Sequence, residues 1–189
     1  MSGSYLTNPL EFLISTIFSL YILAVMLRFL LAALHADFYN PVSQFLVRVT
    51  SPLLNPLRRI IPTIGKLDTA ALVLMLALQM ASLTIILLLR GSDHLSLSAL
   101  FFGSVVELLS LLLNVFIFAI IAQVILSWIN PGTYNPATTL LYSLTTPILE
   151  PIQRHVPPVG GLDLSPLVAL IVLQLLKMIV IPPLLHFLT

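Results

Sequence analysis

The chain alternates between long apolar stretches and short polar ones. Apolar residues fill the stretches 10–34, 69–89, 99–129 and 164–188. None of these stretches alternates apolar with polar residues, as the strands of a membrane barrel do. Each is close to or above the roughly 20 helical residues that cross a hydrocarbon core of about 30 Å. The pattern therefore predicts an all-α membrane protein with four transmembrane helices.

The composition indicates that the bilayer is the solvent of this chain. Of its 189 residues, 59% are hydrophobic and 8% are charged, whereas about 25% of a soluble domain is charged. The net charge of +1 gives no sign of a nucleic-acid-binding surface. The absence of cysteine excludes disulfides, thiolate metal sites and thiol nucleophiles. The first residues lack the basic region of a cleaved signal peptide, so we expect the first apolar stretch to remain as a helix.

The sequence repeats itself at an offset of 95 residues, so that Tyr39-Asn40-Pro41 returns as Tyr134-Asn135-Pro136. We assign residues 1–98 to a first repeat with the connector 35–68, and residues 99–189 to a second with the connector 130–163. Since each repeat crosses the membrane twice, both enter from the same side. The two repeats are therefore parallel, with an expected pseudo-twofold axis along the membrane normal. Further matching pairs are Thr50 with Thr145, Pro52 with Pro147, Pro56 with Pro151, Arg59 with Arg154, Pro62 with Pro157, Gly65 with Gly160, Asp68 with Asp163, and Gln79 with Gln174.

Each connector is predicted to contain a basic amphipathic helix. Across residues 51–64 the apolar positions follow helical spacing, and Asn55, Arg58 and Arg59 fall on the other side. Such a helix beside a transmembrane span lies most simply in the headgroup layer of the bilayer. The residues expected to contact anionic lipid or a partner are Arg48, Arg58, Arg59, Lys66 and Arg154.

The prolines, glycines and aspartates of the connectors are explained first as architecture. Ser51 followed by Pro52 is typical of an N-cap and a first helical residue, and Tyr39-Asn40-Pro41 is interpreted as a turn. Later prolines kink or end the helix, and the glycines allow a turn with positive φ. For the two aspartates we favour helix capping over ion binding. This structural motif comprises Pro52, Pro56, Pro62, Gly65 and Asp68 in the first repeat, and Pro147, Pro151, Pro157, Gly160 and Asp163 in the second.

Basic residues are distributed unequally between the two faces of the predicted membrane protein. The connectors hold five of them, whereas the loop between the repeats offers only Arg90. The excess of Lys and Arg in cytoplasmic loops of membrane proteins therefore places both connectors in the cytoplasm and both termini outside.

The doubled motif Ser/Thr-Pro-x-Leu-x-Pro-x-x-Arg-x-x-Pro-x-x-Gly-x-Leu-Asp, each copy followed by an apolar helix, resembles the YggT family. The resemblance covers nearly the whole chain and implies a small multi-pass protein of the bacterial inner membrane. It also implies a link to osmotic tolerance or to the assembly of membrane complexes. The second copy has Glu150, Gln153 and Gly161 where the first has Asn55, Arg58 and Lys66. Since the second copy is less basic, contacts with lipid or a partner should be asymmetric.

Polar residues inside the apolar stretches are candidates for function, because polar groups in hydrocarbon cost free energy. Gln79 and Gln174 lie about 15 Å into their spans at equivalent positions, which a pseudo-twofold axis would bring face to face. We favour an interhelical amide hydrogen bond over a polar constriction for an ion. Arg28 is equivalent to Gln123 and lies about 9 Å from the cytoplasmic end of its helix, close enough to extend to the interface.

The last span contains one charged residue, Lys177, about 16 Å from its start. Glu107 could form an ion pair with it. The repeat register, however, places Glu107 near the outer surface beside Glu11, so we favour a Lys177 that extends outward. The candidates inside the membrane are Arg28, Gln79, Glu107, Gln123, Gln174 and Lys177.

The sequence offers no evidence for catalysis. It contains no phosphate-binding glycine loop, no His-Glu zinc pattern and no plausible pair of nucleophile and base. We therefore expect no enzyme, cofactor or metal. We expect a non-enzymatic membrane organising or assembly protein whose connectors contact anionic lipids and which has a membrane or cytoplasmic protein partner or a second copy of itself. The alternative is a small channel or transporter subunit, with polar midplane residues lining the path of an ion.

Overall fold

The computed structural model describes residues 4–65, 67–92, 96–129, 135–156 and 163–186. Within these ranges the chain forms only helices as regular elements, and four of them are long and apolar enough to span a membrane, through Asn8–Ala33, Thr69–Leu89, Leu97–Ile129 and Ser165–Leu184. The predicted all-helical architecture with four spans is confirmed. The helices are α1 (Ser4–Ala33), α2 (Pro41–Ile60), α3 (Thr69–Leu89), α4 (Leu97–Ile129), α5 (Pro136–Gln153) and α6 (Ser165–His186).

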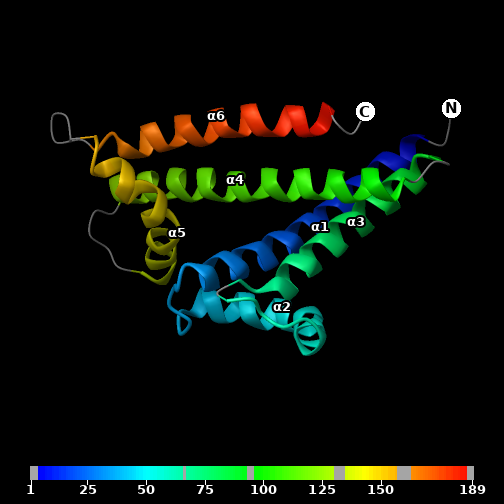
Figure 1. Cartoon of the computed structure of the whole chain (residues 1–189), viewed down its shortest axis with the longest axis horizontal. Coiled ribbons are helices and arrows are strands. Elements are labelled where there is room, and N and C mark those ends of the chain that lie inside the picture. The colour runs from blue at the N-terminus through cyan, green and yellow to red at the C-terminus, as the bar shows by residue number, and fades with distance from the viewer. Residues whose placement is uncertain (1–3, 66, 93–95, 130–134, 157–162, 187–189) are drawn as a thin grey trace.

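Each repeat consists of two antiparallel spans and a connector helix near the end where they are joined. The span α1 packs along α3, and α4 packs along α6. The connector helices α2 and α5 lie toward the same end of the molecule, away from the end where α1 begins and α6 finishes (Figure 1). This placement of both connectors is what parallel repeats require.

The two repeats do not meet around a twofold axis. The span α3 packs against α4, whereas α6, the equivalent of α3, has no contact with α1, the equivalent of α4, in the described ranges. If a twofold axis related the repeats, the pairs α3–α4 and α6–α1 would either both be in contact or both be apart. The expected pseudo-twofold relation is therefore wrong, and α4 serves as the shared helix of both repeats, contributing side chains to two hydrophobic clusters.

The packed interior is built from apolar side chains in the second half of α1, which leads to the first connector, and in α3 and α4. Ile22, Val25, Met75 and Ile120 are almost completely inaccessible. Many large apolar side chains on the outer faces of the four spans stay exposed, as expected where lipid rather than water surrounds the helices. In that setting close packing, rather than exclusion of water, holds the helices together, and the buried Ala70 and Ala71 allow α3 to approach its neighbours closely.

Both connector helices begin earlier than the sequence pattern predicted. Helix α2 starts at Pro41, and the side chain of Asn40 accepts a hydrogen bond from the N–H of Val42 at 2.9 Å. Helix α5 starts at Pro136, and the side chain of Asn135 accepts one from the N–H of Thr138 at 2.9 Å. The Asn-Pro pairs thus supply an N-cap and a first helical residue. The predicted turn at Tyr39 is present and ends at this cap, whereas the interpretation of Ser51 as an N-cap is wrong, because Ser51 lies inside α2.

The later prolines therefore lie inside continuous helices. Threonine and serine hydroxyls just before them donate to carbonyl oxygens four residues earlier, a bond that bends helices, as an internal proline also does. Figure 1 shows that α2 changes direction along its length. The bonds are Thr50 to Leu46 at 2.7 Å, Ser51 to Val47 at 2.5 Å, Thr145 to Leu141 at 2.8 Å and Thr146 to Tyr142 at 2.6 Å.

The return from the first connector to the membrane follows the predicted motif. Helix α2 ends just before Pro62. Gly65 has φ +61° in the tight turn that pairs Ile64 with Leu67. Asp68 then caps α3 by accepting a hydrogen bond from the N–H of Ala71 at 3.2 Å, which confirms its capping role.

The second connector is described only in part, since Pro157 and Gly160 lie outside the described residues, as does Lys66 of the first. Asp163 accepts a hydrogen bond from the N–H of Ser165 at 2.9 Å. Burial raises the pKa of Asp163, but hydrogen bonds from Ser165 and Gln153 outweigh burial, so its pKa lies below the usual value. The carboxylate at the start of α6 is therefore charged at neutral pH.

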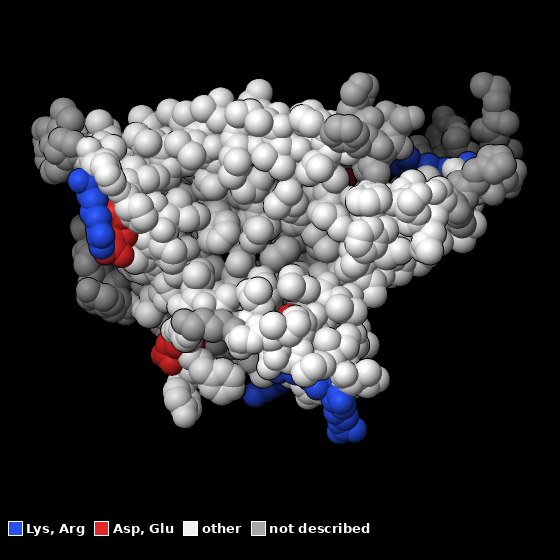
Figure 2. Space-filling view, in the orientation of Figure 1, with Lys and Arg blue, Asp and Glu red and all other residues white. Residues whose placement is uncertain are grey.

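Charged side chains gather at the two ends of the molecule. Figure 2 shows them over α5, along the lower edge beside α2, and at the opposite end where α1 begins. Between these ends lies a broad face formed by α4, α6 and the middle of α1 and α3. The described residues on this face show almost no Lys, Arg, Asp or Glu. Two polar ends separated by an apolar zone are what a membrane-spanning bundle needs.

We predict that Asn40 contributes more to stability than Asn135. Both cap a helix, which contributes about 1 kcal/mol, but the buried Asn40 also donates from Nδ2 to the carbonyl oxygen of Pro136 at 2.7 Å, a bond between repeats of about 1 kcal/mol. Asn40→Ala should therefore lower the free energy of unfolding in detergent micelles by about 2 kcal/mol and Asn135→Ala by about 1 kcal/mol. Equal losses in denaturant titrations followed by circular dichroism would show that the bond between repeats contributes nothing.

Candidate functional site at the first connector

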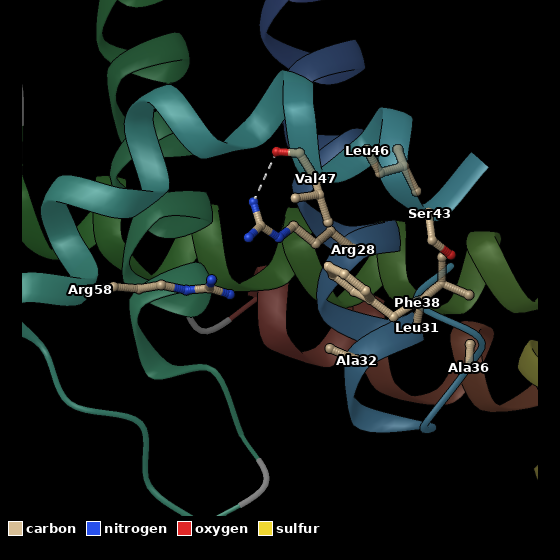
Figure 3. Close-up of a pocket in the computed structure, with 9 residues that line it drawn as sticks. All are labelled: Arg28, Leu31, Ala32, Ala36, Phe38, Ser43, Leu46, Val47 and Arg58. Carbon is tan, nitrogen blue, oxygen red and sulfur yellow. Dashed lines mark hydrogen bonds between the residues drawn. The ribbon is translucent and has the colours of Figure 1, made fainter. Parts of the chain in front are cut away.

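Arg28 ties the first span to the first connector. It is half-buried on α1, and its Nη1 donates to the carbonyl oxygen of Val47 at 3.3 Å (Figure 3). The same Nη1 donates to the hydroxyl of Thr50 at 2.7 Å. A third bond runs from Nη1 to the hydroxyl of Ser51 at 3.2 Å. Thr50 is completely buried. The sequence interpretation has Arg28 extending to the interface; in the structure its guanidinium group is held by α2.

The second repeat makes the same contact without a charge. The hydroxyl of Thr145, also completely buried, is hydrogen-bonded to the side-chain amide of Gln123. Gln123 and Thr145 are the equivalents of Arg28 and Thr50. In both repeats, therefore, a polar side chain of the first span holds a buried threonine of the connector helix.

A second repeated contact joins the connector to the next span. Arg58 of α2 forms an ion pair with Asp68, the residue that caps α3. In the second repeat Gln153 donates to Asp163 at 2.9 Å. The contact is again charged in the first repeat and built from a neutral amide in the second.

The two arginines of the first repeat line one pocket. Its volume is about 310 Å³, and Figure 3 shows the guanidinium groups of Arg28 and Arg58 extending toward one another from α1 and α2. Ser43 adds a hydroxyl to the lining. The rest of the wall is apolar and consists of Leu31, Ala32, Ala36, Phe38, Leu46 and Val47.

The outer surface of α2 carries two further arginines. Arg48 and Arg59 are exposed, and neither forms an ion pair with any residue that the structure describes. At the end of α5, by contrast, Arg154 pairs with Glu150 at 2.7 Å. The first connector therefore presents more uncompensated positive charge than the second, as the sequence asymmetry predicted.

The two midplane glutamines do not face each other. Gln174 is exposed on α6 and Gln79 is half-buried on α3, and these two helices make no contact in the described ranges. The expectation of a facing pair is wrong because α4 separates α3 from α6. The arrangement gives no support at these positions to a polar path for ions.

Lys177 finds a partner that the sequence interpretation missed. Its Nζ donates to Oδ1 of Asn114 on α4 at 2.8 Å, while Glu107 is exposed. The ion pair between Glu107 and Lys177 is thus not formed, and Lys177 is held by α4 at a half-buried position rather than directed outward. The sequence feature that could have indicated this partner is Asn114 itself, a lone asparagine in the middle of a long apolar stretch.

The end opposite the connectors is held by an ion pair. Arg90 contacts Glu11 at 2.9 Å, which joins the end of α3 to the beginning of α1. Hydrogen bonding to this carboxylate raises the pKa of Arg90 above its usual value. Within the described part of the chain, no group of three His, Asp or Glu side chains could hold a metal ion.

We predict that Asn114 and Gln174 differ in their effect on stability. Asn114→Leu removes the partner of Lys177 and leaves an ammonium group unpaired between helices, which should cost about 1–2 kcal/mol. Gln174→Leu should change stability by less than about 0.5 kcal/mol, because this exposed side chain has no hydrogen-bond partner among the described residues. Both values come from unfolding in detergent. A larger loss for Gln174→Leu would reveal a partner of Gln174 in the assembled protein.

Comparison with known proteins gives a consistent result. The model of the family described as CCB3/YggT matches residues 7–89 and 102–184, which are the two repeats. An uncharacterized protein, PA0392, of Pseudomonas aeruginosa is 48% identical over 90% of this chain and 87% of its own length. The uncharacterized protein YggT of Escherichia coli K12 is 34% identical over 90% of this chain and 88% of its own. No solved structure matches.

Proposed function

Since the chain belongs to the CCB3/YggT family and is a multi-pass membrane protein, we propose that it is a non-enzymatic organising or assembly protein of the bacterial inner membrane. Its first connector contacts anionic lipid headgroups at the cytoplasmic surface. The proposal includes a role in osmotic tolerance, as the family resemblance implies. It also includes a membrane or cytoplasmic protein partner or a second copy of the chain.

The observation that supports the proposal is the outer surface of α2. One stripe of this helix, with Leu46, Thr50 and Leu54, is buried against the bundle. The rest exposes charged and large apolar side chains together, a combination that suits the boundary between headgroups and acyl chains. The exposed residues are Arg48 and Arg59 with Val42, Phe45, Leu53 and Ile60.

We predict that the connectors are cytoplasmic and that the opposite loop is outside, because Lys and Arg concentrate in cytoplasmic loops. The chain contains no cysteine, so single cysteines report their own location. In intact spheroplasts a membrane-impermeant maleimide should label Ser92→Cys, and it should label Thr63→Cys only after permeabilisation. The reverse labelling pattern would invert the topology and remove the cytoplasmic surface from the proposal.

We predict that Arg48 and Arg59 give the protein a preference for anionic lipids. A basic residue near an anionic leaflet contributes about 1 kcal/mol, and salt screens exposed charges. With spin-labelled lipids in vesicles, the reconstituted protein should bind phosphatidylglycerol in preference to phosphatidylcholine. The Arg48→Gln, Arg59→Gln double variant should lose most of this preference, and high salt should have the same effect.

The matched control for this experiment is Arg154→Gln. Because Arg154 already pairs with Glu150, its replacement should change the preference much less than the double variant does. A double variant that keeps the full preference, or a wild type with none, would refute the proposed contact with anionic lipid.

A further inference from the structure

We infer that the pocket between Arg28 and Arg58 binds the phosphodiester group of one anionic glycerophospholipid. The inference deepens the proposed function and rests on it for the location of this pocket at a lipid surface. It differs from the general attraction of exposed arginines, because it assigns one saturable site per chain to a pair of side chains from two helices.

The local charge favours a monoanion. Arg28 and Arg58 bring two positive charges to the pocket, and Asp68 compensates one of them through its ion pair with Arg58. Arg28 itself bonds only to neutral acceptors, the hydroxyls of Thr50 and Ser51 and the carbonyl oxygen of Val47. One positive charge is left without a carboxylate among the described residues, and the single negative charge of a phosphodiester would balance it.

The hydrogen-bond donors are also in place. A guanidinium group has five N–H donors. Arg28 uses Nη1 for its bonds to α2, and Arg58 uses Nη2 for its bond to Asp68. The remaining nitrogen atoms of both groups have no acceptor within the described chain. Guanidinium groups bind phosphate oxygens strongly through paired N–H donors, so two of them directed toward one space form a suitable cradle.

The apolar wall favours a lipid over free phosphate. Leu31, Phe38 and Leu46 line the pocket beside the arginines, and glycerol and the first acyl methylenes could pack against them. Arg28 lies five residues before the end of α1, about 7.5 Å along the helix. This depth lies within reach of the lipid phosphate layer.

The second repeat shows which side chains the fold itself requires. Gln123 and Gln153 occupy the positions of Arg28 and Arg58 and make the equivalent contacts with Thr145 and Asp163. A glutamine is therefore compatible with the packing at either position. The arginines of the first repeat add charge and donors that the fold does not need.

The test measures lipid binding to the full chain in a neutral detergent. Dihexanoyl phosphatidylglycerol, dihexanoyl phosphatidylcholine and inorganic phosphate are titrated at constant ionic strength, with thermal unfolding as the readout and native mass spectrometry as the count of bound lipid. We expect saturable stabilisation by the phosphatidylglycerol, with one molecule per chain, and less than a tenth of that affinity for the other two.

The test variants replace each pocket arginine with the glutamine that stands at the equivalent position of the second repeat. Arg28→Gln and Arg58→Gln should each lower the phosphatidylglycerol affinity at least tenfold while the lipid-free protein keeps its helical content. The control Arg154→Gln removes an arginine that already pairs with Glu150 of the second connector, and it should change the affinity less than twofold. A comparable loss in Arg154→Gln, unchanged binding in both pocket variants, or absence of saturation would overturn the inference.

Two further measurements, the titration with inorganic phosphate and the vesicle experiment, distinguish this inference from its alternatives. Equal stabilisation by inorganic phosphate would overturn the assignment to a lipid. The surface preference of Arg48 and Arg59 is measured in vesicles and depends on salt, so its failure would count against the proposed function alone. Failure of the pocket titration with an intact surface preference would count against this inference alone.

Discussion

A buried threonine hydroxyl holds each connector helix to the span that precedes it, and the rest of the fold depends on this contact. Arg28 and Gln123 lie in spans where a polar group without a partner is costly, and Thr50 and Thr145 supply that partner from completely buried positions. The same hydroxyls bond back to the connector backbone. The contact thereby fixes which stripe of the amphipathic helix faces the bundle and which faces outward.

The two repeats have equivalent internal contacts, but they do not pack against each other through equivalent surfaces. The contacts between span, connector and span recur in both halves, but α3 packs on α4 while α6 does not pack on α1. Such a contact is heterologous, because it joins two different surfaces of related units. The helix α4 therefore contributes to both hydrophobic clusters, and equivalent residues such as Gln79 and Gln174 are placed in different surroundings, one half-buried and one exposed.

The sequence was informative wherever a local or periodic signal decides the structure. Span length predicted the four membrane helices, the offset between copies predicted the parallel repeats, and Asp68 was correctly interpreted as a cap. The start of α2 does not follow the doubled Ser/Thr-Pro motif, because Asn40 supplies the N-cap and Pro41 the first helical residue.

The tertiary pairs could not be found in the same way. Arg28 and Thr50 were each noted separately, but no pattern states that they touch across 22 residues. Asn114 and Lys177 lie 63 residues apart, and the order in which helices pack decides whether they meet. The sequence alone could not exclude a twofold axis, because tandem copies of one motif are compatible with either way of packing.

The comparison of the two halves separates the demands of the fold from those of function. At two positions the fold accepts a neutral amide. Gln123 and Gln153 contact Thr145 and Asp163, the equivalents of the threonine and aspartate that Arg28 and Arg58 contact in the first repeat. An arginine at such a position is the more expensive choice, because removing a guanidinium charge from water costs several kcal/mol and an amide costs less. Only the first repeat bears that cost, at the half-buried Arg28, and it places a second arginine, the more exposed Arg58, at the same pocket. Stability of the fold does not explain two arginines at that place, whereas an anionic ligand held between them does.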